Sequence, residues 1–227
     1  MTAITSTIEQ ITRSSSCVVE FNESGMHIFG NEISNYNIIG CPQKCRLQNI
    51  ALIDTNDENS PIIFDDVVYL PLIFPLKSGS DDLEIVYAIT SELEINIRYL
   101  SKFSFENLSR HFSLDALPGK KFNLRPMTYE ERRIYHSSIS DPSPEDALLL
   151  ERLNHRNCWR ISGMIDYCNG IHEYTCITGT ICKIWNFATF KLNSEIVGDI
   201  WEDLTGSELC FGVCFDCLHI HGYLRRD

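Results

Sequence analysis

A dense group of metal-ligand side chains lies near the end of the chain. Cys210, Cys214, Cys217, His219 and His221 fall within twelve positions. Thiolate and imidazole are ligands that zinc prefers, so this tail is a candidate metal site. The same segment is apolar and rich in β-forming residues, and cysteine is among the most often buried residue types. Two interpretations therefore stay open: a zinc site and the last strand of a core.

Strand geometry divides this group of five. If Leu209–Tyr223 forms one strand, alternate side chains share a face, and Cys217, His219 and His221 project together. Three protein ligands with an open fourth position are the arrangement of catalytic zinc, so one hypothesis is a zinc-binding metalloprotein, such as a hydrolase. The other two cysteines would then face the core.

Other reactive side chains give weaker patterns. Cys41 and Cys45 could supply two ligands to a structural zinc, or they could be unrelated thiols at strand ends. His155 and Cys158 have the residue types of a cysteine nucleophile and its base, but no family signature surrounds them. The Gly-x-Ser-x-Gly, Gly-x-Gly-x-x-Gly and P-loop patterns are absent. The sequence thus favours a protein that is not an enzyme.

The charge of the chain is strongly negative. The net charge is −12, and residues 1–113 contribute 15 acidic against 7 basic side chains. Such a surface repels phosphate backbones and anionic lipids, so we expect neither nucleic acid nor membrane as a partner. The basic residues between 120 and 160 lie among carboxylates, and helix pairing explains most of them. A negatively charged surface attracts positive charge, so we expect a basic protein as the partner.

Acidic side chains in predicted loops and turns are the candidates for binding such a partner. They are Asp54, Asp57, Glu58, Asp81, Asp82, Glu84, Asp166 and Glu173. The last two would face each other if Asn169-Gly170 closes a two-residue hairpin. The leading hypothesis is a non-enzymatic acidic binding protein, similar in its use of charge to immunity proteins and inhibitors.

The elements that must position these residues are mainly strands. Short β-type runs fill the first hundred residues, and Leu93–Tyr99 alternates as a half-buried antiparallel strand does. Ser104–Phe112, a capping box at Thr128–Glu131 and a proline-capped start at Ser143 predict short helices in the middle. Strands return from Trp159 onwards. These patterns predict an α+β fold with largely antiparallel sheet.

We expect a single domain over residues 1–227. The alternative is two β-rich lobes, 1–103 and 157–227, joined by a helical middle, 104–156. No apolar run approaches the roughly 20 residues of a membrane helix, and the first residues lack the features of a secretory signal. We therefore predict a cytoplasmic protein whose ten cysteines are mostly reduced, and we make no prediction of its oligomeric state.

Overall fold

The computed structural model describes residues 16–32, 35–41, 47–60, 67–75, 84–101, 117–136, 142–154, 160–161, 171–175, 181–191, 207–214 and 216–226. Its strands are β1 (Cys17–Phe21), β2 (His27–Phe29), β3 (Asn37–Ile39), β4 (Gln48–Asp54), β5 (Tyr69–Phe74), β6 (Glu84–Ser91), β7 (Glu94–Leu100), β8 (Lys120–Pro126), β9 (Arg160–Ile161), β10 (Ile171–Thr175), β11 (Ile181–Lys191), β12 (Ser207–Cys214) and β13 (Ile220–Arg226). Two short helices, α2 (Tyr129–His136) and α3 (Pro144–Asn154), lie between β8 and β9. The predicted α+β class with largely antiparallel sheet is confirmed.

All these strands belong to one hydrogen-bonded sheet. Their order is β3-β7-β6-β13-β12-β11-β9-β1-β8-β2-β4-β5, and β10 pairs with the first half of β11. Strands from the first hundred residues are neighbours of strands that follow residue 159, since β13 pairs with β6 and β9 pairs with β1. Among the described pairs, β3 with β7 is parallel and the others are antiparallel.

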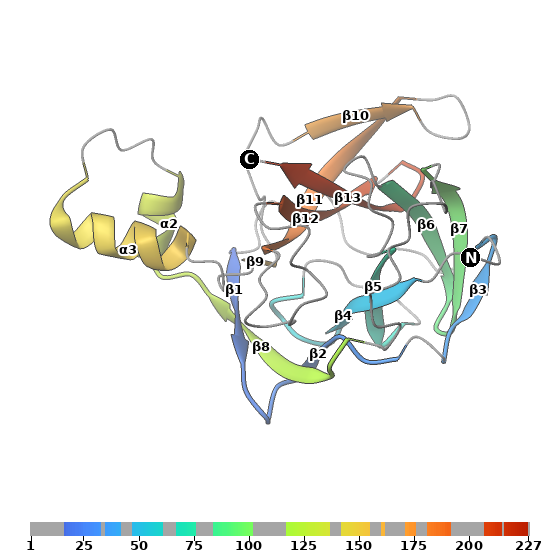
Figure 1. Ribbon diagram of the computed structural model, residues 1–227, viewed down its shortest axis with the longest axis horizontal. Coiled ribbons are helices and arrows are strands. Elements are labelled where there is room, and N and C mark those ends of the chain that lie inside the picture. The colour runs from blue at the N-terminus through green and yellow to red at the C-terminus, as the bar shows by residue number, and fades with distance from the viewer. Residues whose placement is uncertain are drawn as a thin grey trace, which may run out of the picture.

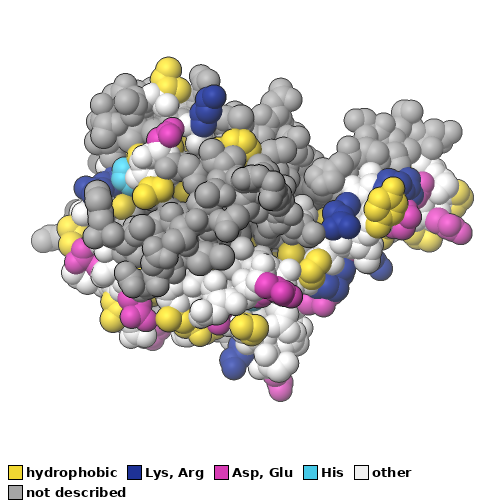
Figure 2. Space-filling model, turned by 180° about the vertical axis from the view of Figure 1, so that it is seen from behind, with side chains coloured by type: hydrophobic (Ala, Val, Ile, Leu, Met, Phe, Trp, Pro, Cys, Tyr) yellow, Lys and Arg dark blue, Asp and Glu magenta, His cyan; other side chains and the backbone are white. Residues whose placement is uncertain are grey.

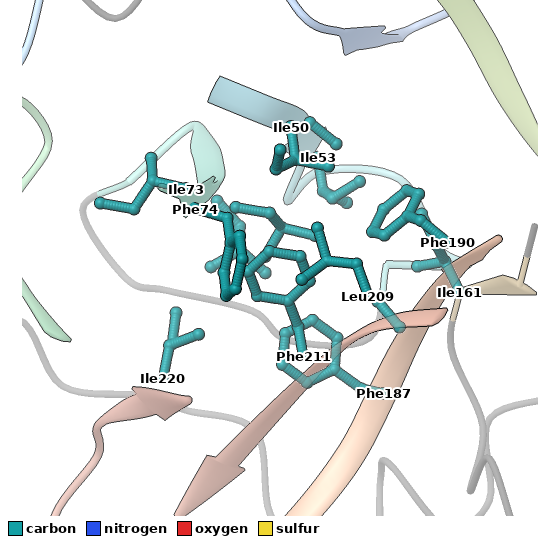
Figure 3. Close-up of a cluster of buried hydrophobic side chains, with 14 of the residues drawn as sticks. Ile50, Ile53, Ile73, Phe74, Ile161, Phe187, Phe190, Leu209, Phe211 and Ile220 are labelled. Atoms are coloured by element: carbon teal, nitrogen blue, oxygen red, sulfur yellow. The ribbon is translucent and has the colours of Figure 1, made fainter. Parts of the chain in front are cut away.

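The sheet folds back on itself around one large hydrophobic core. Side chains from β4 and β5, including Ile53 and Phe74, meet side chains from β11 and β12, including Phe187 and Phe211 (Figure 3). Each of these four side chains is fully buried. The helix pair projects from this body at one end (Figure 1), and Met127 and Leu153 pack there against Val18 of β1.

The local helix signals are confirmed. Thr128 and Glu131 form the capping box: the Glu131 N–H donates to Thr128 Oγ1 at 3.2 Å, and the Thr128 N–H donates to Glu131 Oε2 at 2.8 Å. The Asp146 N–H donates to Ser143 Oγ at 3.1 Å, so Ser143 caps α3 as expected. Of the apolar stripe on α3, Leu149 is half-buried and Leu153 is buried.

The middle of the chain contains two of the predicted short helices, α2 and α3, and also a strand that was not predicted. Strand β8 lies within residues 104–156, and it separates β1 from β2 in the sheet. Its Phe122 and Leu124 are buried, whereas Lys120 and Lys121 are exposed. The predicted helix over Ser104–Phe112 lies outside the described residues.

The tail is a hairpin and not one strand, which corrects the prediction for Leu209–Tyr223. Strands β12 and β13 pair from Ser207↔Arg226 to Val213↔Ile220. The turn is closed by two hydrogen bonds: the Leu218 N–H donates to the Cys214 carbonyl at 2.7 Å, and the Cys214 N–H donates to the His219 carbonyl at 3.0 Å. Cys217 therefore lies in a turn, and alternation along one strand does not place it beside the histidines.

The predicted strand at Leu93–Tyr99 is confirmed in its centre. Ile95 and Ile97 of β7 are buried, but Leu93 lies in the preceding turn with 54 % of its surface exposed, and Tyr99 is 39 % exposed. Within the described residues, no helix is long and apolar enough to cross a membrane.

Candidate functional site

Charge is unevenly distributed over the described residues. Between residues 26 and 101 these hold seven carboxylates and one cation, Arg98. The carboxylates are Glu32, Asp54, Asp57, Glu58, Glu84, Glu92 and Glu94. Lys and Arg side chains concentrate toward the helical end, on the right of Figure 2. The described residues of this part of the chain are therefore almost free of positive charge.

Four of these carboxylates form a surface that we call the acidic rim, defined as Asp54, Glu58, Glu92 and Glu94 together with Tyr36 and Tyr69. Asp54 and Tyr69 are cross-strand partners at the ends of β4 and β5. Burial, followed by the nearby charges of Glu92 and Tyr69, raises the pKa of Tyr36 to about 12. Tyr36 thus lies between the β4–β5 end and the β6–β7 turn.

The rim also exposes apolar side chains. Leu93 is 54 % exposed beside Glu92, and Val68 is 41 % exposed beside Tyr69. Figure 2 shows carboxylates and hydrophobic side chains alternating along the lower left edge of the body, the side on which β3, β6 and β7 lie in that view. Tyrosine with apolar contacts inside a charged border is a composition typical of protein-binding surfaces.

The loop that carries Asp54 and Glu58 is held rigidly by its own side chains. Asp54 Oδ1 accepts from the Asn56 N–H at 2.9 Å, and Asp57 Oδ1 accepts from the Asn59 N–H at 2.9 Å. These are Asx turns, in which the aspartate side chain replaces a backbone partner. Glu58 lies within the second of these turns and is exposed. The two turns therefore order the backbone that carries this carboxylate, which lowers the entropic cost of binding.

A buried histidine anchors this loop to β2. His27 is fully buried, and its Nδ1 accepts from the Asp54 N–H at 2.9 Å. The other ring nitrogen, Nε2, therefore carries the hydrogen and donates to Asp57 Oδ2 at 2.8 Å. Burial lowers the pKa of His27, although the hydrogen bond to Asp57 acts in the opposite direction.

This His–Asp pair has the residue types of a general base and its orienting carboxylate. Both ring nitrogens already have hydrogen-bond partners, so His27 has no ring nitrogen left to bind a substrate. Its role is structural, because it connects β2 to the loop of Asp54 and Asp57. Sequence reasoning did not find His27. The cluster of Asp and Asn residues at 54–59 indicated a turn but carried no signal that a histidine 30 positions away would hold it.

The remaining predicted partner-binding residues do not gather on the rim. Asp57 faces His27, and Glu84 begins β6 at the opposite end from Glu92. Burial raises the pKa of Glu84, which is half-buried. Glu173 pairs in register with Lys183 across β10 and β11. Asp81, Asp82 and Asp166 lie outside the described residues, so the predicted pairing of Asp166 with Glu173 stays a prediction.

The basic residues of β8, α2 and α3 are largely occupied by carboxylates. Arg125 donates to Glu20 and to both oxygens of Glu131, and Arg152 donates to Glu131 Oε1 at 2.8 Å. Arg133 bridges Glu130 of its own helix and Asp146 of α3. Ion pairing accounts for these three arginines, but only Arg133–Glu130 pairs within one helix, and the other pairs join different elements, which helix pairing did not predict.

The residues of the predicted zinc site have different surroundings. Cys217 is half-buried in the turn and packs against Cys214, which is fully buried. His221 is 1 % exposed, and burial together with His219 lowers its pKa to about 4. Burial, and then the charge of Arg98, lowers the pKa of half-buried His219. Cys210 is buried in β12, as predicted.

Over the described ranges, no three His, Cys, Asp or Glu side chains are grouped so that they could hold a metal ion. The zinc site at Cys217, His219 and His221 thus stays a prediction without geometric support. Cys41 is half-buried against the core, whereas Cys45, His155 and Cys158 lie outside the described residues. No family model, curated protein or solved structure matches this chain, so its function must be argued from the site.

Proposed function

We propose that this protein is a non-enzymatic, cytoplasmic binding protein that holds a basic protein partner on its acidic rim. The observation that carries the proposal is the placement of Tyr36 and Tyr69 near Glu92 and Asp54, in a part of the chain, residues 26–101, whose described residues include one cation. Aromatic side chains supply buried contact area, and carboxylates around them select a positively charged surface.

The geometry of the rim supports binding and not turnover. Its carboxylates come from turns fixed by internal hydrogen bonds, such as Thr90 Oγ1 to Glu94 Oε1 and Asn37 Nδ2 to Glu94 Oε2. Such a preorganised surface loses little entropy when a partner docks. Complementary charge raises the association rate, and salt screens this advantage over about 10 Å at 0.1 M ionic strength.

The test is a pull-down from the native host at low salt with three versions of the chain. One is the natural sequence, one carries Glu58→Lys and Glu92→Lys on the rim, and the control carries Glu145→Lys and Glu151→Lys on α3. All four glutamates are exposed, and both variants change the net charge equally. We expect basic proteins to be retained by the natural chain and the control, and lost from the rim variant.

Two results would reject the proposal. The natural chain could retain no basic protein above background, or the rim variant could retain the same proteins as the α3 control. The second result would show that net charge, and not the rim, attracts the partner.

A further inference from the structure

The β12–β13 turn brings two cysteines together. Cys214 and Cys217 are three positions apart, their side chains pack against each other, and both are thiols. The hydrogen bond from the Leu218 N–H to the Cys214 carbonyl closes the turn at 2.7 Å. This bond closes a five-residue turn, and the contact between the two cysteine side chains is what a disulfide requires, since its Cα atoms lie roughly 4.4–6.8 Å apart.

The two thiols differ in access. Cys217 is half-buried, so part of this residue is open to solvent, whereas Cys214 is fully buried. Of the other described thiols, Cys17 and Cys210 are buried, and Cys41 is half-buried like Cys217 but lies outside this turn. Access therefore makes Cys217 the entry point of the pair and Cys214 the resolving thiol.

A buried ring nitrogen follows the turn directly. The Nδ1 atom of His219 is buried and has no hydrogen-bond partner within the described part of the chain. The contact between the two cysteine side chains in the turn of this hairpin leads to a proposal independent of the acidic rim.

We propose that Cys214 and Cys217 form a reversible dithiol–disulfide site that exchanges with small-molecule disulfides of the glutathione class. The Cys217 thiolate attacks one sulfur of the disulfide RSSR, the S–S bond breaks, and RS⁻ leaves to become RSH. The Cys214 thiol then loses its proton and attacks the Cys217 sulfur, which releases the second RSH. Two thiols are oxidised to one disulfide, and RSSR is reduced by two electrons and two protons.

Mass spectrometry of the full-length protein tests this directly. The protein is equilibrated in buffers of increasing oxidised-to-reduced glutathione ratio, quenched in acid, unfolded, alkylated and cut with trypsin. Cleavage after Lys191 and Arg225 gives a peptide that holds Cys210, Cys214 and Cys217, so the Cys210→Ser variant is used to leave two cysteines. Circular dichroism of each variant confirms folding before the titration.

We expect this peptide to pass from two alkyl groups to none, with the mass of an internal disulfide, in one transition. Cys214→Ser should instead accumulate glutathione on Cys217, and the native reduced protein should be alkylated at Cys217 about tenfold faster than at Cys214. Cys41→Ser is the matched control, because Cys41 is also half-buried, and the variant should leave the transition unchanged.

Three outcomes would overturn the proposal. The peptide could keep two alkyl groups at every glutathione ratio, or it could stop at a mixed disulfide with no internal bond. Alternatively, the purified protein could contain one zinc per chain that protects both thiols until a chelator is added, which would make the turn a metal site.

Discussion

Glu131 is the residue on which the helix pair depends. Its carboxylate is 2 % exposed and accepts hydrogen bonds from Arg125, from the Thr128 N–H and from Arg152. These donors come from β8, from the start of α2 and from α3. One buried carboxylate therefore links both helices to the sheet, and the hydrogen bond from Arg125 is the main cause that lowers its pKa to about 2.

Replacing Glu131 with Gln should destabilise the protein by about 2–4 kcal/mol, because two arginines lose their charged acceptor. Glu130→Gln is the control, since its ion pair with Arg133 is exposed, and we expect it to cost less than about 1 kcal/mol. Urea denaturation at pH 7 measures both. Equal losses in the two variants would refute the central role of Glu131.

The Glu131 carboxylate also makes the stability of the folded chain depend on pH in the acidic range. Its pKa is about 2 in the folded chain and near 4.5 in the unfolded one, so its stabilisation is complete above about pH 4.5. It is lost as pH falls from there toward 2, because the unfolded state then binds a proton that the folded state rejects. The natural chain should lose up to about 3 kcal/mol over this range, and Glu131→Gln should show a flatter profile in the same denaturation experiment.

His221 should make the stability of the folded chain depend on pH over a second, higher pH range. Burial lowers its pKa from 6.5 to about 4, so the folded state resists protonation that the unfolded state accepts. Stability is therefore complete above about pH 6.5 and falls as pH drops toward 4, by up to about 3 kcal/mol from this residue. His221→Gln should reduce that slope in denaturation curves at pH 7, 5.5 and 4. If the slope of unfolding free energy against pH is the same in His221→Gln, the acid sensitivity comes from other groups, above all the buried His27, whose pKa is also lowered.

At the scale of elements, the turn between β1 and β2 must pass over a third strand. The Asn22 N–H donates to the Lys121 carbonyl at 3.1 Å, and the Met26 N–H donates to Asn123 Oδ1 at 3.1 Å. The turn thus lies directly on β8. A Cβ atom at Gly25 would come within 2.4 Å of the Phe122 backbone, closer than any real contact allows.

Gly25→Ala should therefore destabilise this end of the sheet by about 2–4 kcal/mol, because strand backbone cannot move aside without breaking its ladder. Gly119→Ala is the matched control at the start of β8, where an added Cβ meets Asn31 at an ordinary 3.7 Å. We expect the control to change the free energy of unfolding by less than about 0.5 kcal/mol. Thermal and urea unfolding would compare them, and similar stabilities would contradict the tight crossing.

Elements with local signals were predicted well, and elements that depend on distant partners were not. The caps at Thr128 and Ser143 need residues three positions away, which a sequence displays directly. Strand β8 alternates at Phe122 and Leu124, but this run was not predicted as a strand, and its pairing with β1 and β2 is what makes it one. The tail hairpin depends on Leu218 at a φ of +58°, a conformation that leucine seldom adopts and no composition predicts.

The candidate site likewise has features that the sequence predicted and features that it did not. Charge composition pointed to the acidic loop at Asp54–Glu58, because counting carboxylates needs no fold, and binding of a partner there stays a prediction. That Tyr36 and Glu92 lie near this loop follows from the folding of β3, β5 and β6 toward one another, which no spacing in the chain encodes. Asp57 looked equally available in the sequence, but His27 binds it in the folded chain.

For the molecule as a whole, the hydroxyl of one tyrosine, Tyr87, hydrogen-bonds to the backbone of the edge strand β5. Strand β5 ends the strand order, and its Pro71 has no N–H to donate, as expected of an edge strand. Tyr87 of β6 reaches this edge: its hydroxyl donates to the Pro71 carbonyl at 2.8 Å and accepts from the Ile73 N–H at 3.3 Å. The folding of the sheet thus brings strands that are far apart in its order into contact.

Tyr87→Phe should test this closure with the removal of one oxygen. Tyr87 is fully buried, so the change leaves a backbone donor and an acceptor without their partner inside the core, and we expect a loss of about 1–3 kcal/mol. Tyr129→Phe is the control, because that ring is 69 % exposed on α2 and should change stability by less than about 0.5 kcal/mol. Hydrogen exchange adds the decisive readout: the Ile73 amide should lose protection in Tyr87→Phe more than amides of β12 do. If all amides lose protection equally, the Tyr87 hydroxyl contributes to the global stability of the protein but does not specifically hold β5 in place.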